Sequence, residues 1–226
     1  MRIYSNFPEA LNEIKRDLAE MGIRIHTRTY QDKFIGDDPD FETLEIQNYA
    51  YTVTQPKLTD LNPTQPWADA EFMERLSGKP QNPGEAWKLR REVWDDFLDQ
   101  DGQFGYTYSE RLAEYGQVNR IVKALDNDPL SRQAFISVWQ PSDVQYLGGI
   151  SRVPCTLGYL LQIRQDQLNL TYLQRSCDFA THMQNDIYLA HKLQVTVAEM
   201  LNVPVGLYSH WFGSLHIFKK DVKGVF

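Results

Sequence analysis

Residues 155–201 read CTLGYLLQIRQDQLNLTYLQRSCDFATHMQNDIYLAHKLQVTVAEML, and this stretch contains the clearest structural signals of the chain. Cys155 to Gln174 has the pattern of two strands that flank a turn at Arg164-Gln165-Asp166. Gln184 to Leu201 follows as the clearest helix, because its apolar residues lie on one face. Those residues are Ile187, Ala190, Leu193, Val197 and Leu201. Two strands and then a long helix, without regular βα alternation, indicate an α+β fold.

Elements of both kinds are also predicted outside this stretch. Helical periodicity predicts helices over Pro8–Met21, Trp67–Leu76, Glu85–Leu98 and Val118–Leu125. Alternating or continuous apolar patterns predict strands over Ile23–Tyr30, Leu44–Tyr51, Ala134–Trp139, Val205–Phe212 and Leu215–Phe218. Gly213 is expected to separate the last two strands. The second half of the chain is therefore expected to be rich in β-sheet.

Length and composition exclude several classes of protein. The 226 residues are typical of one domain, so a single domain over residues 1–226 is expected. A net charge of −7 and a pI near 5.2 argue against nucleic acid as a partner. Cys155 and Cys177 are too few for a disulfide scaffold, which favours a reducing cytoplasm. No stretch approaches the roughly 20 apolar residues that cross a bilayer, and no signal sequence is seen, so no membrane partner is expected.

The nucleotide-binding signature of the thymidylate synthase family closely resembles one part of this sequence. Pro154-Cys155 precedes Gln174-Arg-Ser-Cys-Asp178 by about twenty residues, and Asn185-Asp186 follows. The resemblance implies a thymidylate synthase-like fold, with a large mixed β-sheet flanked by helices. It also implies that Cys155 is the nucleophile, although a cysteine taken alone is more often a small buried hydrophobe. Arg152 and Arg175 are candidates to favour its thiolate.

Three further segments resemble the same family. Glu71 begins a segment with the spacing of the family's catalytic glutamate, and Gly105-Tyr-Thr-Tyr108 resembles a turn near the nucleotide. Trp94-Asp-Asp-Phe resembles the family's tryptophan segment. The resemblance therefore implies that Cys155, Glu71 and Tyr108 are catalytic residues. It implies that Trp94 and Asp178 bind the co-substrate.

The resemblance also implies six substrate-binding residues: Arg28, Arg132, Arg175, Ser176, Asp186 and His216. In the family, the arginine at the position of Arg132 reaches across a homodimer to the phosphate in the partner's site, so a homodimer is expected. Gln133 replaces the usual second arginine. Phe218 replaces a tyrosine whose hydroxyl normally binds the sugar, which leaves the choice between ribose and deoxyribose open.

Three departures from the synthases resemble the phage deoxycytidylate (dCMP) hydroxymethylases. Asp186 stands where synthases usually have the asparagine that reads the pyrimidine edge. Thr156 stands where they usually have histidine, and Gly213-Ser-Leu-His216 replaces Gly-Asp-x-His. An amide matches the N3–H and O4 of uracil, whereas a carboxyl group suits the N3 and exocyclic amine of cytosine. Cytosine is therefore the expected base, and the host cytoplasm is the expected compartment if a phage encodes the chain.

The resemblance implies a mechanism that uses 5,10-methylenetetrahydrofolate as co-substrate. The Cys155 thiolate would add to carbon 6 of a pyrimidine nucleoside monophosphate, and carbon 5 would then take up the one-carbon unit. A hydroxymethylase completes the reaction with water, for which Glu71 is the candidate organiser. No metal is expected, because His182, His191 and His210 are not at ligand spacing with cysteine or carboxylate partners.

Two alternatives remain open. A divergent thymidylate synthase would methylate dUMP and would require Asn185, one residue before Asp186, to read the base. That shift turns the side chain by about 100° around a helix. A catalytically silent homologue would bind a nucleotide without turnover, and the short stretch of ten residues after His216 favours this alternative.

Overall fold

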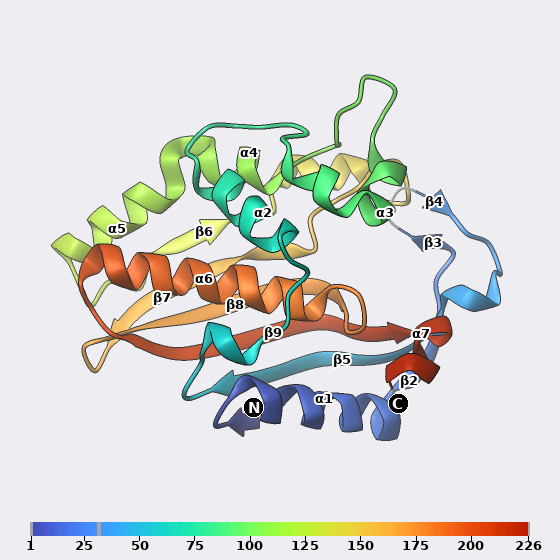
Figure 1. Ribbon diagram of the computed structural model, residues 1–226, viewed down its shortest axis with the longest axis horizontal. Helices are drawn as coiled ribbons and strands as arrows, with labels where there is room; N and C mark the ends of the chain where they lie inside the picture. The colour runs from blue at the N-terminus through green and yellow to red at the C-terminus, as the bar shows by residue number, and fades with distance from the viewer. Residues whose placement is uncertain (1, 31–32, 226) are drawn as a thin grey trace.

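A seven-stranded mixed sheet forms the centre of the computed structural model, which describes residues 2–30 and 33–225. The strands are β1 (Arg2–Tyr4), β2 (Ile23–His26), β5 (Glu42–Val53), β6 (Phe135–Ser137), β7 (Thr156–Arg164), β8 (Gln167–Asp178) and β9 (Val205–Phe218). Their order is β1-β5-β9-β8-β7-β6, and β2 pairs with the first residues of β5, from Glu42 to Glu45 (Figure 1). A short hairpin of β3 (Thr29–Tyr30) and β4 (Lys33–Phe34) lies outside this sheet. The predicted mixed sheet is confirmed.

The hairpin of β7 and β8 has the predicted turn. The two strands are antiparallel and pair as far as Arg164 and Gln167. Gln165 and Asp166 both have left-handed backbone angles, with φ of 52° and 59°. Two such residues close a two-residue hairpin loop whose twist matches that of the strands.

In the described part of the chain, seven α-helices surround the sheet: α1 (Phe7–Met21), α2 (Trp67–Leu76), α3 (Arg91–Trp94), α4 (Tyr108–Ala113), α5 (Gln117–Asn127), α6 (Met183–Leu201) and α7 (Lys219–Val225). Helix α6 lies across the sheet beside β8, and α1 lies along β5 (Figure 1). Ile187, Ala190, Leu193 and Val197 of α6 are buried, as their common face predicts. The predicted helices at Pro8–Met21, Trp67–Leu76, Val118–Leu125 and Gln184–Leu201 are confirmed within two residues at each end.

The prediction of one continuous helix over Glu85–Leu98 is wrong. The segment contains a 3₁₀ helix (Ala86–Arg90), then α3, and then a second 3₁₀ helix (Asp95–Phe97). Arg90 leaves the helical region with φ −147° and ψ 50°. Its buried guanidinium donates to the Thr181 carbonyl at 3.1 Å and lies 4.9 Å from the Trp67 ring centroid. This tertiary contact accompanies the break in a pattern that looks helical locally.

The prediction that Gly213 separates two strands is also wrong, because β9 continues from Val205 to Phe218. A Cβ at position 213 would lie 2.8 Å from the Arg175 carbonyl oxygen of β8. Glycine therefore allows a close approach of two strands here, and it does not mark a turn. The single predicted strand Ile23–Tyr30 is likewise divided into β2 and β3.

The end of the sheet that matters for function is set by the parallel pair of β8 and β9. Their register aligns Ser176 with Ser214 and Asp178 with His216. Because parallel strands end at the same edge, these polar residues lie side by side. Cys155, immediately before β7, and the first turn of α6 meet this edge as well.

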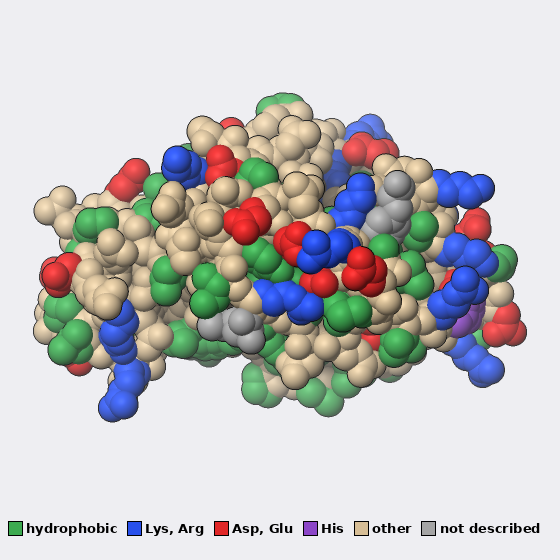
Figure 2. All heavy atoms as spheres, turned by 90° about the horizontal axis from the view of Figure 1, so that it is seen from below, with side chains coloured by type: hydrophobic (Ala, Val, Ile, Leu, Met, Phe, Trp, Pro, Cys, Tyr) green, Lys and Arg blue, Asp and Glu red, His purple; other side chains and the backbone are tan. Residues whose placement is uncertain are grey.

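Acidic and basic side chains are interspersed on the face drawn in Figure 2, where Lys and Arg lie beside Asp and Glu. A mixed surface of this kind does not provide the basic stripe that nucleic acids require. Among residues 2–30 and 33–225, no helix combines the length and apolar character needed to span a membrane.

Candidate active site

A cavity of about 390 Å³ opens at the edge where β8 and β9 end. Its walls come from β3, β5, β8, β9 and the start of α6, together with the segments around residues 67–75, 93–108 and 146–155. Eight of the predicted site residues line it: Trp94, Tyr108, Cys155, Arg175, Ser176, Asp178, Asp186 and His216. Residues that are up to 122 positions apart in the sequence thus meet in one place.

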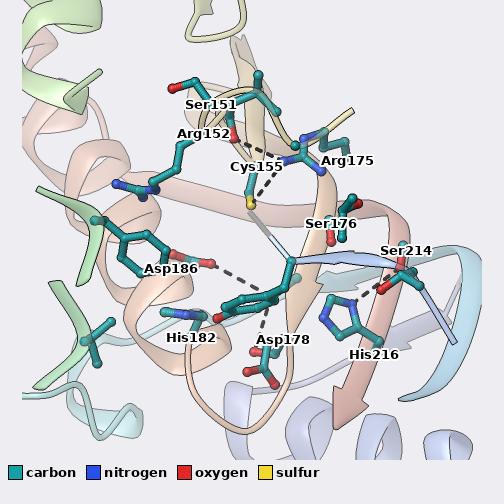
Figure 3. Close-up of a pocket in the computed structure, with 18 of the residues that line it drawn as sticks. Ser151, Arg152, Cys155, Arg175, Ser176, Asp178, His182, Asp186, Ser214 and His216 are labelled. Carbon is teal, nitrogen blue, oxygen red and sulfur yellow. Dashed lines mark hydrogen bonds between the residues drawn. The ribbon is translucent and has the colours of Figure 1, made fainter. Parts of the chain in front are cut away.

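Cys155 is half-buried immediately before β7, and Arg175 of the neighbouring strand β8 hydrogen-bonds to the backbone around it. The Arg175 backbone N–H donates to the Cys155 carbonyl at 2.8 Å, and its Nε donates to the Pro154 carbonyl at 2.9 Å. One terminal nitrogen of Arg175 donates to Val153 and lies 3.8 Å from Cys155 Sγ (Figure 3). A guanidinium at this position favours the thiolate form of the sulfur.

Arg152, the second cation proposed for Cys155, extends to the opposite side of the cysteine from Arg175 (Figure 3). Its guanidinium lies among aromatic rings, of which Phe97 is nearest at 4.6 Å and Trp94 follows at 5.1 Å. The structure therefore assigns the cysteine contact to Arg175.

Asp186 lies in the first turn of α6 on the inner wall of the cavity. Its Oδ2 accepts a hydrogen bond of 2.9 Å from Gln174 Nε2 and lies 3.8 Å from the Cys177 thiol. Burial raises the pKa of Asp186 above its usual value, although His182 and the Gln174 amide oppose this effect. The other carboxyl oxygen, Oδ1, makes none of the hydrogen bonds found among the described residues.

A chain of buried hydrogen bonds fixes the orientation of the Gln174 amide. Burial lowers the pKa of His210 well below its usual value, so its ring is neutral. The hydroxyls of Tyr51 and Tyr208 both lie 3.4 Å from His210 Nδ1 and can donate to it. Nε2 then carries the proton and donates to Gln174 Oε1 at 2.8 Å. The Gln174 amide group consequently points its nitrogen at Asp186.

Glu71 lies beside the cavity but does not line it, and Arg75 takes that place. Arg75 Nε donates to Glu71 Oε1 at 2.8 Å, one helical turn apart on α2. Burial lowers the pKa of Arg75, but the Glu71 carboxylate together with the Tyr159 and Tyr108 phenols more than offsets this, and the pKa is raised overall. The Arg75 guanidinium carbon lies 3.8 Å from the ring centroid of Tyr108. The sequence interpretation missed Arg75, although the Glu–Arg spacing of four residues on a helix was a signal.

Tyr108 and Thr156 belong to one hydroxyl chain behind the cysteine. The Tyr108 hydroxyl lies 3.1 Å from Thr156 Oγ1, which lies 2.7 Å from the Tyr172 hydroxyl. Burial raises the pKa of both phenols well above the usual value, so both stay protonated. Thr156 therefore holds Tyr108 in place and is itself fully buried.

His216 and Asp178 face each other at the ends of β9 and β8. His216 Nδ1 lies 3.4 Å from the Ser214 hydroxyl, and burial lowers the pKa of the ring. Asp178 is buried and accepts from the Ala180 backbone N–H at 3.0 Å. Phe218 packs edge-on against Tyr30, with 5.6 Å between the two ring centroids. The Phe218 side chain therefore belongs to an aromatic contact.

Besides Glu71, two predicted site residues do not line the cavity. Arg28 is exposed, between Thr27 and Thr29, which do line it. Arg132 is exposed ahead of β6. Its predicted role concerns the site of a second copy of the chain.

Metal ligands do not come together in the part of the chain that the structure describes. Within residues 2–30 and 33–225, no group of three or more His, Cys, Asp and Glu side chains is arranged to hold an ion.

Relatives of known identity resemble this chain along most of its length. A thymidylate synthase of Bacillus phage phi3T is 23% identical over 230 residues, covering 96% of this chain and 81% of that protein. A thymidylate synthase of Clostridium beijerinckii is 25% identical over 134 residues, covering 59% of this chain. In that second match the chain spans 50% of the relative's length.

Solved structures resemble the fold. Thermostable thymidylate synthase A from Bacillus subtilis superposes with a TM-score of 0.77 at 21% identity, over 97% of this chain and 82% of that one. Thymidylate synthase from T4 phage gives a TM-score of 0.74 at 21% identity, over 96% and 79%. The family profile described as "Thymidylate synthase" matches residues 75–226, which is more than half of the chain. The chain therefore belongs to the thymidylate synthase family.

Proposed function

We propose that the chain transfers a one-carbon unit from 5,10-methylenetetrahydrofolate to carbon 5 of a cytidine monophosphate, dCMP or CMP, and completes the product with water. This is a cytidylate 5-hydroxymethyltransferase. The observation that carries the proposal is the carboxyl group of Asp186, held on the wall of the same cavity as Cys155.

Cys155 is the proposed nucleophile. Its thiolate, favoured by Arg175, adds to carbon 6 of the base and makes carbon 5 nucleophilic. After the new carbon is attached, carbon 5 would lose its proton and the bond from the new carbon to the folate nitrogen would break, releasing tetrahydrofolate. Once water has added to the new carbon, the sulfur leaves carbon 6 and the aromatic ring is restored. Cys177 does not suit this role, because burial raises the pKa of its thiol well above the usual value.

Asp186 is the proposed reader of the base. The fixed Gln174 amide requires Asp186 Oδ2 to accept, which leaves Oδ1 as the place for a proton. Because burial raises the pKa of the carboxyl group, a protonated Oδ1 can donate to cytosine N3. A carboxyl oxygen can also accept from the exocyclic amine, which uracil lacks.

The sugar and phosphate are proposed to lie on the other side of Cys155. Arg175, Ser176 and His216 are grouped there, away from Asp186 (Figure 3). Arg175 keeps terminal N–H groups for a phosphate, and the neutral His216 ring has a nitrogen available for the sugar. Arg28 at the rim and Arg132 from a second copy would add positive charge, which makes a homodimer part of the proposal.

The residues present fit a folate. A cavity of about 390 Å³ lies within the range of small-ligand sites, and Trp94 and Tyr106 give it an aromatic wall. The buried carboxylate of Asp178 can accept from a ring N–H. When bound, 5,10-methylenetetrahydrofolate would supply the carbon that becomes attached to the base.

Water is proposed to enter near the Glu71–Arg75 pair. The Glu71 carboxylate is the candidate to take a proton from that water, and Arg75 lies between Glu71 and the cavity. Addition of hydroxide to the new carbon produces the hydroxymethyl group. This step distinguishes the proposed enzyme from a synthase, in which a hydride completes the methyl group.

Methylation of dUMP is the second candidate, because the named relatives are thymidylate synthases. Reading uracil with Asn185 has no support from the geometry. The Asn185 amide is buried, with its Oδ1 accepting from the Thr64 N–H at 2.7 Å, and it does not line the cavity.

Product analysis tests the proposal. The protein is mixed with methylenetetrahydrofolate and with dCMP, CMP or dUMP, and the nucleotide product and folate oxidation state are identified. We expect hydroxymethylated cytidylate and tetrahydrofolate. Thymidylate with dihydrofolate would refute the proposal in favour of a synthase, and absence of product from all three nucleotides would favour a silent binding protein.

A further inference from the structure

Arg152 is a buried cation in the cavity wall without a countercharge among the described residues. It is 8% exposed, and its Nε is buried without a hydrogen-bond partner. Its guanidinium carbon lies within 6 Å of four ring centroids: Phe97 at 4.6 Å, Trp94 at 5.1 Å, Tyr106 at 5.4 Å and Phe104 at 5.9 Å. No ion pair or hydrogen bond of this side chain is found within residues 2–30 and 33–225.

Such an arrangement is costly unless a ligand completes it. Burial of an unpaired charge is strongly unfavourable. Cation–π attraction to the aromatic rings offsets only part of that cost. Arg75, the other buried arginine that lines the cavity, differs because it is paired with Glu71.

The roles already assigned do not use Arg152. Arg175 approaches the sulfur of Cys155, and Arg152 extends to the opposite side (Figure 3). The proposed phosphate and sugar contacts also lie on the Arg175 side. Arg152 instead shares its wall with Trp94, the residue expected to bind the co-substrate.

We propose that Arg152 binds the folate, donating from the edge of its guanidinium to a planar oxygen acceptor of that ligand. Surrounding rings hold the guanidinium, and it lines the cavity. A guanidinium donates paired, coplanar N–H groups, which match a carboxylate or a ring carbonyl. In a folate these acceptors are the glutamate carboxylates and the pterin carbonyl. The inference rests on the proposed function.

Binding measurements test the inference without turnover. The full-length wild-type protein, Arg152→Met and Arg152→Lys are titrated with folic acid by calorimetry in the presence of saturating dCMP. Loss of a charge-assisted hydrogen bond raises the Kd for folic acid by about 10- to 100-fold in Arg152→Met. The Kd for dCMP is expected to stay within about twofold. Arg152→Lys keeps the charge but loses the planar pair of N–H donors, so its Kd for folic acid should lie between those of wild type and Arg152→Met. Arg152→Lys also provides the test if Arg152→Met does not fold.

Pteroic acid, which lacks the glutamate, identifies the acceptor. An equal loss of affinity for pteroic acid and folic acid would assign the contact to the pterin carbonyl, and a loss confined to folic acid would assign it to the glutamate. Both results support the inference. Unchanged binding of both compounds by a folded variant would overturn it.

Two controls distinguish folate binding by Arg152 from a role in activating Cys155. The rate of Cys155 alkylation is measured against pH, and we expect Arg152→Met to leave the profile unchanged. A profile displaced to higher pH with normal folate binding would mean that Arg152 serves the thiolate, and the inference would fail. Release of tritium from carbon 5 of dCMP without folate reports addition of Cys155. If the wild-type protein releases tritium and the Arg152 variants bind folic acid normally, the inference alone is refuted. If the wild-type protein neither releases tritium nor binds folic acid, the proposed function is refuted as well.

Discussion

Replacement of Asp186 by asparagine should shift the base preference of the protein from cytosine toward uracil. The neutral His210 ring fixes the Gln174 amide, and that amide presents its N–H to residue 186. An asparagine at 186 must therefore turn its Oδ1 toward Gln174 and its amide nitrogen toward the base. That nitrogen only donates, so it suits O4 of uracil and opposes the exocyclic amine of cytosine.

The magnitude follows from the burial of the contact. When the amide of the Asp186→Asn variant faces the exocyclic amine of cytosine, two donors meet in a buried site and one stays unpaired, which costs about 1–3 kcal/mol. The new hydrogen bond to uracil contributes about 1 kcal/mol. Together they give about 3 kcal/mol, which corresponds to a change of about 150-fold in the ratio of kcat/KM for dCMP to that for dUMP. Most of the change should appear as a loss with dCMP.

The assay measures kcat/KM for both nucleotides with saturating methylenetetrahydrofolate, in wild type, Asp186→Asn and the matched control Asn185→Asp. The control introduces a carboxyl group one position earlier, where the side chain contacts Thr64 and not the cavity. It should leave the ratio within about threefold, because it does not touch the base. An unchanged ratio in Asp186→Asn would refute the role of Asp186, and a reversed ratio in the control would move that role to residue 185.

Three further predictions concern the nucleophile, the buried ion pair and the pH dependence of stability. Cys155→Ser should lower kcat by at least about 1000-fold while the Kd for dCMP stays within about threefold; retained turnover would exclude it as the nucleophile. Arg75→Met leaves Glu71 with a half-buried unpaired charge and should lower the free energy of unfolding, measured in urea, by about 2 kcal/mol. Adding Glu71→Met to the same chain should restore part of this loss. An unchanged urea midpoint in Arg75→Met would show that the pair is not stabilising. Because burial lowers the pKa of His210 in the folded state, the unfolded chain binds more protons below about pH 6.5, so the unfolding free energy should fall as the pH drops through that value. His210→Gln should flatten this dependence, and an equal slope in both proteins would argue against a neutral His210.

The secondary structure of the second half could be predicted from the sequence because its signals are local. The apolar face of α6 and the turn at Gln165-Asp166 follow from periodicity and residue type. Local signals misled where a distant contact decided the backbone. Arg90 breaks a helical pattern while it contacts Thr181, and Gly213 allows a strand to pass close to Arg175.

The sequence by itself indicated the motif around Arg175 and the carboxyl group of Asp186, which are eleven positions apart, but it did not indicate Arg75. It also determined that Asn185 and Asp186 point in different directions, because successive residues of a helix are about 100° apart. Only the tertiary structure decided how those groups are oriented. The Gln174 amide takes its direction from His210, 36 residues away on another strand, and Arg152 and Arg175 extend to opposite sides of Cys155. Hydrogen-bond direction and the pairing of buried charges depend on neighbours across the fold, and periodicity along one segment carries no information about them.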